Sequence, residues 1–279
     1  MAKTRGGAGL VAAGLGWGVA LGIALGALVL APAMPGSVDL GFSEFKDEAG
    51  QHVDGTDLAV AQARAQEAND LLAQESGSIV SGALRDVPVT IVRTAAADAD
   101  DVESVRWLLN AAGASDSGEL TLTERFTNQA SADELSTIVA NTLPSGAQLS
   151  VQDRSPGTHA GESLAAVLLN DGTSGDSKSL AADRTLVLET LQHAGFVEYS
   201  GSIVQADAVV IVDGPARSNE FSAKVIGDFA KALAVGGKVA LATQDMEPDL
   251  LDGVNVIGGV DREAGRIKSV LAVSSGDSD

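Results

Sequence analysis

The chain has 279 residues, which is enough for a membrane segment and one large or two small domains. Hydrophobic residues make up 45% of it and aromatic residues only 3%, so its core has to be built from Ala, Val, Leu and Ile. The net charge of −20 argues against nucleic acid or an anionic membrane surface as a partner of the exposed part, and the absence of cysteine excludes disulfides, thiolate metal sites and a catalytic thiol.

The first predicted element is a transmembrane helix in the uncharged apolar run at residues 7–31. A helix of this length reaches ~37 Å and can cross a ~30 Å hydrocarbon core. Lys3 and Arg5 precede the run, so the positive-inside rule keeps the N-terminus in the cytoplasm and the bulk of the chain outside the membrane. The alternative is a cleaved signal peptide, whose apolar core is usually only ~7–15 residues long. We therefore predict a retained membrane anchor at residues 1–36.

Glycine recurs at every fourth position within this predicted anchor. Residues four apart lie on nearly one face of a helix, so the glycines form a smooth groove that another helix can approach closely. The alternative explanation is that small residues are common in membrane helices. We predict helix packing, and a homo-oligomer formed through the anchor, at the glycine stripe Gly14, Gly18, Gly22 and Gly26.

Residues 37–86 are predicted to form a linker and a short juxtamembrane stalk helix. Proline and glycine among mixed charges are typical of a linker as far as residue 56. Beyond it, apolar residues follow alternating spacings of three and four, as in a coiled-coil seam. The seam is too short and too rich in alanine to predict a firm coiled coil alone. It consists of Leu58, Ala61, Ala65, Ala68 and Leu72.

Residues 87–273 are predicted to form an extracytoplasmic α/β domain with a mainly parallel, helix-flanked sheet, and residues 274–279 a disordered tail. The β-branched run at 87–92 and the consecutive apolar residues at 208–212 are typical of strands covered on both faces. Asp98 and Gly113 bound a helical stripe, and Ser131 with Glu134 predicts a capping box that begins another helix. Further helices are expected at 180–194 and 218–235, strands at 119–126, 196–199, 238–243, 254–257 and 267–273, and a weakly structured crossing at 146–161.

Two segments, 89–124 and 209–245, repeat the same order of strand, polar loop, glycine-terminated helix and strand. This repetition predicts two related βαβ halves. The alternative is that any α/β protein repeats such a pattern.

The same elements carry no recognisable motif for catalysis or for cofactor binding. The strand at 208–212 leads into Asp213-Gly214-Pro215-Ala216 and not into the glycine-rich turn of a dinucleotide site. Serines, histidines and acids are present, but without the spacing of a nucleophile elbow. We therefore expect no catalytic residues and no bound cofactor, and we expect the chain not to be an enzyme.

Metal ligands cannot be assigned from the sequence. Soft ligands for Cu(I) have to converge, whereas His52, His159 and His193 are far apart and Met34 and Met246 stand alone. Tight copper binding by the external domain is therefore not expected, although weak attraction of cations to carboxylates is. Helix capping accounts for the acidic residues between 98 and 103, and the helix dipole for His193.

Trp107 is a candidate interaction residue. At 100° per residue, it lies almost opposite the apolar stripe of its predicted helix, so its side chain should face outward. In a chain with so few aromatic residues, this position predicts a partner surface. The alternative is that a neighbouring loop covers the ring.

Several segments carry a resemblance to a known family. They are the apolar run 15–32 with the stalk helix, Gly82-Ala83-Leu84 with 87–93, Leu120-Thr121-Leu122-Thr123 with Phe126, the turn at 143–149, and Gly265-Arg266-Ile267 with Val270-Leu271-Ala272. Together they resemble the actinobacterial copper transport protein B (MctB) family over nearly the full length. The segments are turns and strands, so the resemblance supplies no ligand or catalytic residues.

The resemblance implies a cell-envelope protein of mycolic-acid bacteria, described as a channel-forming outer-membrane protein that limits intracellular copper. A channel could arise from self-assembly of the anchors, or the chain could act on copper tolerance indirectly. The first hypothesis is thus an anchored, oligomeric envelope protein that aids copper efflux, with copper as the transported ion. The second is a scaffolding protein whose acidic α/β domain binds an envelope partner. The third, an envelope enzyme, has no residue set behind it.

Overall fold

The computed structural model describes residues 55–170, 178–215 and 219–274. The chain falls into two units, of which the first extends to Ala68 and the second begins at Asn69. The predicted anchor with its glycine stripe, nearly all of the linker and residues 275–279 lie outside the described residues. In the part of the chain that is described, no helix combines the length and the apolar character needed to cross a membrane.

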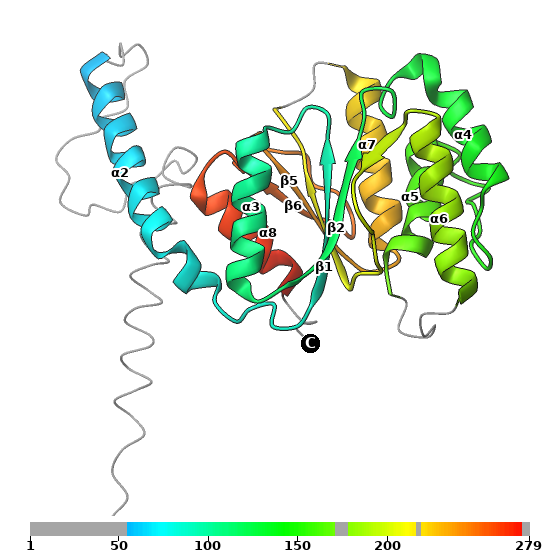
Figure 1. Cartoon of the computed structure of the whole chain (residues 1–279). Coiled ribbons are helices and arrows are strands. Elements are labelled where there is room, and N and C mark those ends of the chain that lie inside the picture. The colour runs from blue at the N-terminus through cyan, green and yellow to red at the C-terminus, as the bar shows by residue number, and fades with distance from the viewer. Residues whose placement is uncertain (1–54, 171–177, 216–218, 275–279) are drawn as a thin grey trace, which may run out of the picture. The chain divides into compact units, whose positions relative to one another are not determined.

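The second unit is built on a single mixed sheet (Figure 1). Its strands are β1 (Pro88–Thr94), β2 (Ser115–Leu122), β3 (Val197–Tyr199), β4 (Ala208–Val212), β5 (Lys238–Thr243) and β6 (Asn255–Gly258). They lie in the order β3-β2-β1-β4-β5-β6, and neighbours run parallel except β3, which is antiparallel to β2. The predicted central strands, β1 and β4, are confirmed, because every residue of β4 is buried between the two layers that flank the sheet.

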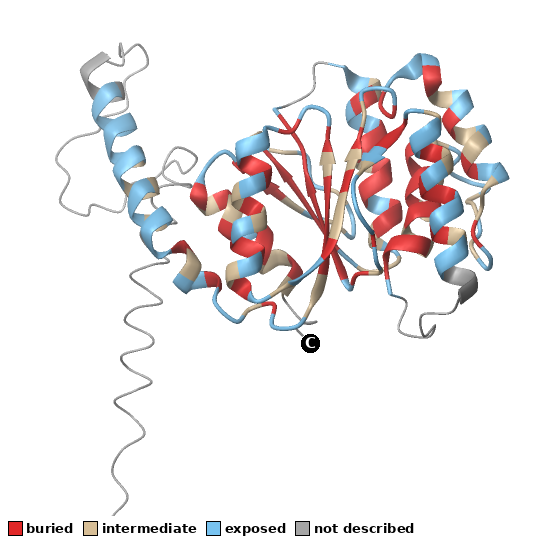
Figure 2. Cartoon of the chain, viewed as in Figure 1, coloured by how far each residue is buried: buried red, intermediate tan, exposed pale blue. Residues whose placement is uncertain are grey.

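Helices cover both faces of this sheet (Figures 1 and 2). One face carries α3 (Ala99–Ala112) and α8 (Glu263–Ser274). The other carries α7 (Glu220–Ala234), α5 (Pro156–Leu168), α4 (Ala132–Asn141) and α6 (Lys178–His193). Each layer encloses its own core of mainly aliphatic side chains, with Phe126 and Phe229 in edge-to-face contact at 5.5 Å between centroids in the second. The predicted α/β class is therefore confirmed.

The two predicted βαβ segments correspond to β1–α3–β2 and β4–α7–β5. In each, the helix connects two strands that are adjacent and parallel in the sheet. In the first βαβ segment β2 lies on one side of the central pair β1 and β4, and in the second segment β5 lies on the other side. Because the two connections have the same hand, α3 and α7 lie on opposite faces of the sheet. The two βαβ segments share one topology, and their origin by duplication stays a prediction.

The stalk helix exists as α2 (Gly55–Val80) and continues past the predicted seam. From Asn69 onward it belongs to the same unit as the sheet. Leu72, the last residue of the seam, packs against the core beneath α3 and α8, and Asn69 Oδ1 accepts a hydrogen bond from Glu263 N at 2.8 Å. This end of α2 is therefore fixed to the domain, while coiled-coil pairing stays a prediction.

Helix ends were predicted with mixed success. Asp98 Oδ1 accepts from Asp100 N at 2.8 Å and Gly113 closes α3 with φ of 87°, as expected. The capping box at Ser131 is wrong, because this residue ends a short 3₁₀ helix, η1 (Gln129–Ser131), and its backbone is already helical. The helix expected at 218–235 is α7, whose cap is Asn219, while residue 218 lies outside the described residues.

Two further predictions are wrong. Residues 267–273 belong to α8 and not to a strand, because Ile267, Val270 and Val273 recur every three residues and are buried together on one helical face. The weakly structured crossing ends early, because α5 begins at Pro156. Its glycines were read as loop residues, but a Cβ on Gly157 would lie 2.3 Å from Val225 O, so the helix needs them to approach α7.

Candidate functional site

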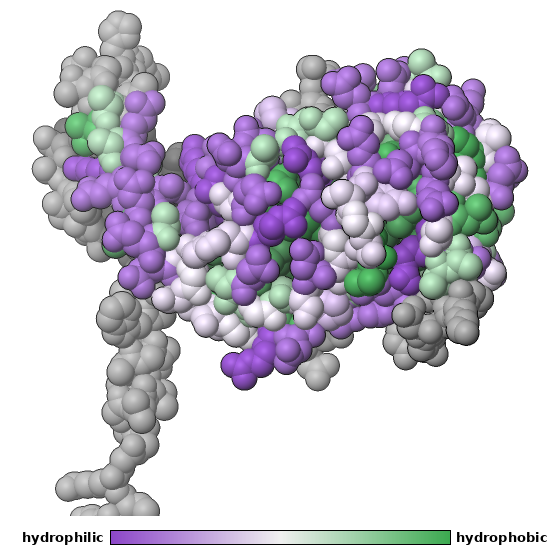
Figure 3. Space-filling view, in the orientation of Figure 1, coloured by the Kyte–Doolittle hydropathy of each residue, from purple (hydrophilic) through white to green (hydrophobic). Residues whose placement is uncertain are grey.

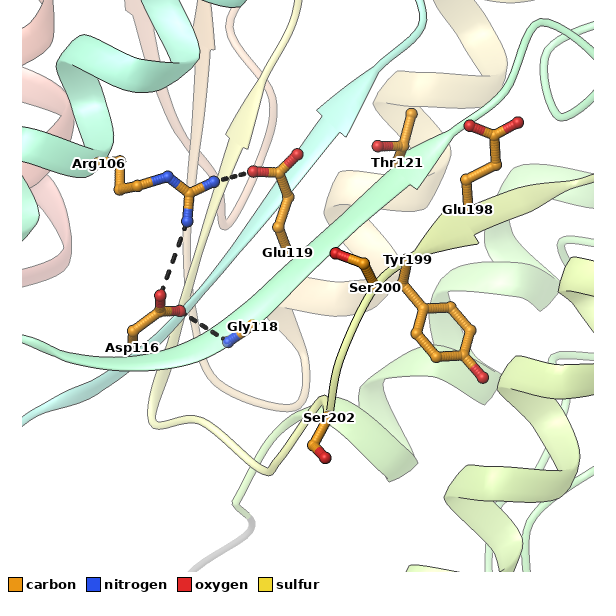
Figure 4. Close-up of a pocket in the computed structure, with 9 residues that line it drawn as sticks. All are labelled: Arg106, Asp116, Gly118, Glu119, Thr121, Glu198, Tyr199, Ser200 and Ser202. Carbon is orange, nitrogen blue, oxygen red and sulfur yellow. Dashed lines mark hydrogen bonds and ion pairs between the residues drawn. The ribbon is translucent and has the colours of Figure 1, made fainter.

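A polar groove lies over β2 and β3 on the side of the sheet that carries α3 (Figure 4). Helices α4, α5 and α6 pack on the opposite side, where Leu120, Leu122 and Val197 are buried in the core. Glu119 and Thr121 alternate with these leucines and so face the groove, where Thr121 stands opposite Glu198 of β3. The groove has a volume of about 610 Å³ and is lined by Arg106, Asp116, Gly118, Glu119, Thr121, Glu198, Tyr199, Ser200 and Ser202.

Arg106 of α3 forms one wall of the groove and holds the acidic residues of β2. Its guanidinium pairs with Glu119 Oε2 and lies 3.6 Å from both Asp116 Oδ2 and Glu103 Oε1. Asp116 Oδ1 in turn accepts a hydrogen bond from Gly118 N at 2.8 Å (Figure 4). One guanidinium is therefore paired with three carboxylates, and its single positive charge cannot neutralise all three.

The outer wall is formed by the chain that follows β3. Val204 N donates to Ser117 O at 3.0 Å, so this segment runs beside the first half of β2. Gly118 has φ of 113°, and a Cβ there would lie 3.1 Å from Ile203 Cγ1. Glycine thus permits both the irregular backbone of β2 and the close approach of the wall that carries Ser200 and Ser202.

The electrostatic character of the groove is acidic and polar. Glu198 is exposed and its side-chain carboxylate has no ion pair or hydrogen bond with other described residues, and the same holds for the hydroxyls of Thr121, Ser200 and Ser202. Strongly hydrophilic residues gather in the middle of the face displayed in Figure 3, beside α3. Tyr199 turns away from the acids (Figure 4), and its pKa is raised above 10.0 by burial and then by the charge of Glu189.

The carboxyl ends of β1 and β4 are where the sheet reverses its winding, which is where open α/β sheets usually bind ligands. Here Thr94 Oγ1 donates to Asp213 Oδ1 at 2.5 Å. A Cβ on Gly214 would lie 2.1 Å from Ala96 O, so the two following loops touch through their backbones. A pocket of about 150 Å³ lies beside them, lined in part by Thr94 and Ala96, and it shares Glu124 and Thr127 with a polar pocket of about 680 Å³.

The soft ligands considered for copper do not meet in the described residues. His159 Nε2 lies 3.0 Å from Ser150 O, His193 is the last residue of α6, and His52 and Met34 lie outside the described ranges. Met246 is half exposed beside Gly259. In residues 55–170, 178–215 and 219–274, no group of three or more His, Cys, Asp and Glu side chains could hold a metal ion.

Trp107 lies on the outer side of α3, as predicted, with 56% of its surface exposed. Part of the ring is covered by helix α2 and not by a loop, because a Cβ on Gly77 would lie 3.1 Å from Trp107 Cη2. Its role as an interaction residue stays a prediction. The same is true of Gly14, Gly18, Gly22 and Gly26, which lie outside the described residues.

Sequence reasoning missed the groove residues. The alternation of Glu119 and Thr121 with Leu120 and Leu122 was recognised as a strand, and it already carried the signal that one face of this strand is not buried. The contribution of Glu198 depends on β3 joining the sheet antiparallel to β2, which no local pattern specifies.

Comparison with known proteins assigns the chain to a family. The family model "Copper transport outer membrane protein, MctB" matches residues 8–277. The chain belongs to the MctB family. Among its relatives, the copper transporter MctB of Mycobacterium tuberculosis is 30% identical over 219 residues, covering 72% of this chain and 70% of the relative. MctB of Mycobacterium leprae is 27% identical over 219 residues, covering 71% and 69%. The family resemblance predicted from the turn and strand segments is therefore confirmed.

Proposed function

We propose that this chain is a membrane-anchored protein of the cell envelope that takes part in copper homeostasis by aiding copper efflux. The observation that carries the proposal is membership of the MctB family over residues 8–277, together with relatives that are named copper transporters. The family description, which names the outer membrane, supports a place in the cell envelope.

The anchor is proposed to hold the chain in the membrane and to assemble it. Residues 7–31 contain no charge and are long enough to span a bilayer as a helix, with Lys3 and Arg5 on the cytoplasmic side. Helices in lipid gain little from apolar contact with one another, so association has to come from close backbone approach at small residues. The stripe from Gly14 to Gly26 supplies such a surface for a homo-oligomeric channel.

The α/β domain is proposed to act without catalysis, through binding. It has no convergent set of metal ligands among its described residues, so copper would pass or be controlled elsewhere in the assembly. Scaffolding without transport is the second candidate, and the polar groove over β2 and β3 favours it because an open polar surface is suited to contact with a partner.

Growth of a deletion strain in graded copper, with cellular copper measured by mass spectrometry, tests the proposal. Loss of the gene should raise cellular copper and lower copper tolerance, and the parent gene should restore both. The variant Gly18→Ile/Gly22→Ile keeps the anchor apolar but fills the groove, so it should lose crosslinked oligomers and fail to restore tolerance. Unchanged cellular copper in the deletion strain would exclude the proposed role.

The control variant is Gly9→Ile/Gly16→Ile, which makes the same changes about 150° around the helix from the stripe. It should assemble and restore tolerance like the parent. Lost oligomers with normal copper tolerance in the Gly18/Gly22 variant would favour scaffolding over a channel. Calorimetry of the purified protein with Cu(I) gives an independent check, since a stoichiometric tight site would contradict a domain that does not bind copper itself.

A further inference from the structure

The groove over β2 and β3 is open because the helices that follow β2 cross to the other side of the sheet. On the α3 side, the floor made by Glu119, Thr121 and Glu198 therefore has no helix above it. The side chains on the floor are polar, so this surface can remain in contact with water or with a polar partner. An apolar floor of this kind would be expected to be buried by another element or by a partner.

Negative charge exceeds positive charge around this groove. Four carboxylates stand at or next to it, and one guanidinium, that of Arg106, pairs with three of them. Arg93 of β1 is the next cation along the sheet, beside Thr121 in register, but it donates to Ala97 O at 3.1 Å. Even with both cations counted, the surroundings keep an excess of two negative charges. The four carboxylates are those of Glu103, Asp116, Glu119 and Glu198.

The size and lining of the groove favour a polypeptide over a small molecule. Small-molecule sites are mostly apolar and enclose most of their ligand. This groove is open and mainly polar, with a volume of about 610 Å³. The hydroxyls of Thr121, Ser200 and Ser202 have no partner among the described residues and can bond to the backbone of an extended segment.

The occupant has to come from another kind of molecule. A second copy of this chain also carries a net charge of −20, so even where anchors associate it is a poor source of cations for an acidic groove. The parts of the chain outside the described residues hold four basic and nine acidic residues, so they are acidic as well. Within those parts the basic residues are Lys3, Arg5, Lys46 and Arg217.

We propose that this groove binds an extended segment of a partner polypeptide and holds one of its arginine or lysine side chains between Glu198 and Glu119. The two glutamates are diagonal neighbours on adjacent strands, because Thr121 stands directly opposite Glu198. Diagonal neighbours lie ~7–8 Å apart, which leaves space for a cationic group between their carboxylates. Arg106 already shows this mode of binding, with its guanidinium between Glu119 and Asp116 (Figure 4). The proposal does not depend on a role in copper transport.

The test uses the full chain in detergent and a fluorescent peptide of six arginines, with the uncharged citrulline peptide as its isosteric counterpart and spermine as a small cation. Binding is measured by anisotropy at physiological salt. Glu198→Gln removes the exposed, unpaired charge and should fold normally. This substitution should lower the affinity for the arginine peptide about fivefold, as expected for the loss of one exposed ion pair. Glu247→Gln is the matched control, since Glu247 is exposed in the loop between β5 and β6.

The expected result is that the arginine peptide binds, the citrulline peptide binds at least tenfold more weakly, and Glu247→Gln changes affinity less than twofold. Equal effects of Glu198→Gln and Glu247→Gln would mean that binding follows the overall charge, and would overturn the site. Equal binding of the citrulline peptide would overturn the role of the cationic side chain. If spermine competes as strongly as the peptide at the same molar concentration, a polypeptide occupant is overturned and a small polyamine is the better assignment.

Discussion

The two faces of the sheet are assembled in different ways. On the α5 and α7 face, two helices touch through their backbones, because a Cβ on Gly161 would lie 2.6 Å from Phe229 O and Gly157 makes a similar contact. On the α3 and α8 face, buried charges link the elements: Arg266 Nη2 donates to Asp101 Oδ1 at 2.7 Å and Gln244 Nε2 to Asp101 Oδ2 at 2.8 Å.

This difference explains where a binding surface can form. Close helix packing on the α5 and α7 face extends over β2 and β3, so that side is closed by an apolar core. The other face has fewer helices among the described residues, and beside α3 it leaves the acidic groove uncovered. The α3 and α8 face therefore combines a charged support with an open polar surface. Substitutions on each face can show whether its stability depends on these interactions.

The largest effect is expected from Arg266→Met. Asp101 is only 6% exposed at its side chain and Glu263 only 9%, and both pair with Arg266. Removing the guanidinium leaves buried carboxylates without their cation, which should lower the free energy of unfolding by ~3–5 kcal/mol. Urea unfolding followed by circular dichroism measures the change.

A double variant separates the lost charge from lost packing. Arg266→Met/Asp101→Leu no longer buries the Asp101 carboxylate, so it should be more stable than Arg266→Met alone. If the double variant is less stable than the single one, packing and not charge holds this face together. That result would remove the contrast between the two faces.

The next largest effect is expected from Gly161→Ala on the other face. Alanine normally favours a helix over glycine, but its Cβ would lie 2.6 Å from Ala232 Cβ and from Phe229 O. The two helices would have to separate, at a cost of ~1–3 kcal/mol in unfolding free energy. Thermal unfolding should show a lower transition temperature.

Gly227→Ala is the matched control, because it makes the same substitution in α7 where there is space. Its Cβ would lie 3.6 Å from the nearest side-chain atom, Leu251 Cδ2. Higher helix propensity should then raise the free energy of unfolding by up to ~1 kcal/mol. If both alanine variants were equally stable, close backbone approach would not be what closes this face.

The same contrast shows what could be predicted from the sequence. Local patterns predicted the strands at 87–92 and 208–212, because burial on both faces favours runs of β-branched and apolar residues. They also predicted both ends of α3, where Asp98 and Gly113 act on nearest neighbours. These features depend only on residues close in sequence, so the signal is complete within one segment.

Long-range contacts account for what was missed. Gly157 and Gly161 were interpreted as loop residues. Glycine is needed at these positions because α7 approaches closely, and α7 lies far along the chain. Asp101 was explained as a helix-start residue, although its carboxylate binds Arg266 and Gln244. In the groove, Arg106, Glu119 and Glu198 come from a helix and two strands, so only the sheet order brings them together.

A smaller effect is expected from Trp107→Ser. The side chain is more than half exposed, and only part of it packs over Gly77 of α2, so unfolding free energy should fall by less than ~1 kcal/mol. If the exposed ring forms part of a partner surface, crosslinked complexes in the native envelope should decrease. Unchanged complexes would leave the ring as packing for α2, and the α3 side would then offer only its polar groove.

The smallest effect on stability is expected from ionisation of Tyr199 at high pH. This residue packs against the core on the α5 and α7 face of the sheet. Its folded-state pKa is raised above 10.0, first by burial and then by Glu189. A raised pKa contributes stability that is complete below the unfolded-state pKa and is lost as pH rises through the folded one, so stability should decline above about pH 10. Tyr199 is the only tyrosine, so phenolate absorbance reports it directly. Glu189→Gln should lower this pKa, while Glu198→Gln, which faces the groove, should leave it unchanged. An equal shift in both variants would mean that the sheet does not separate the two faces electrostatically.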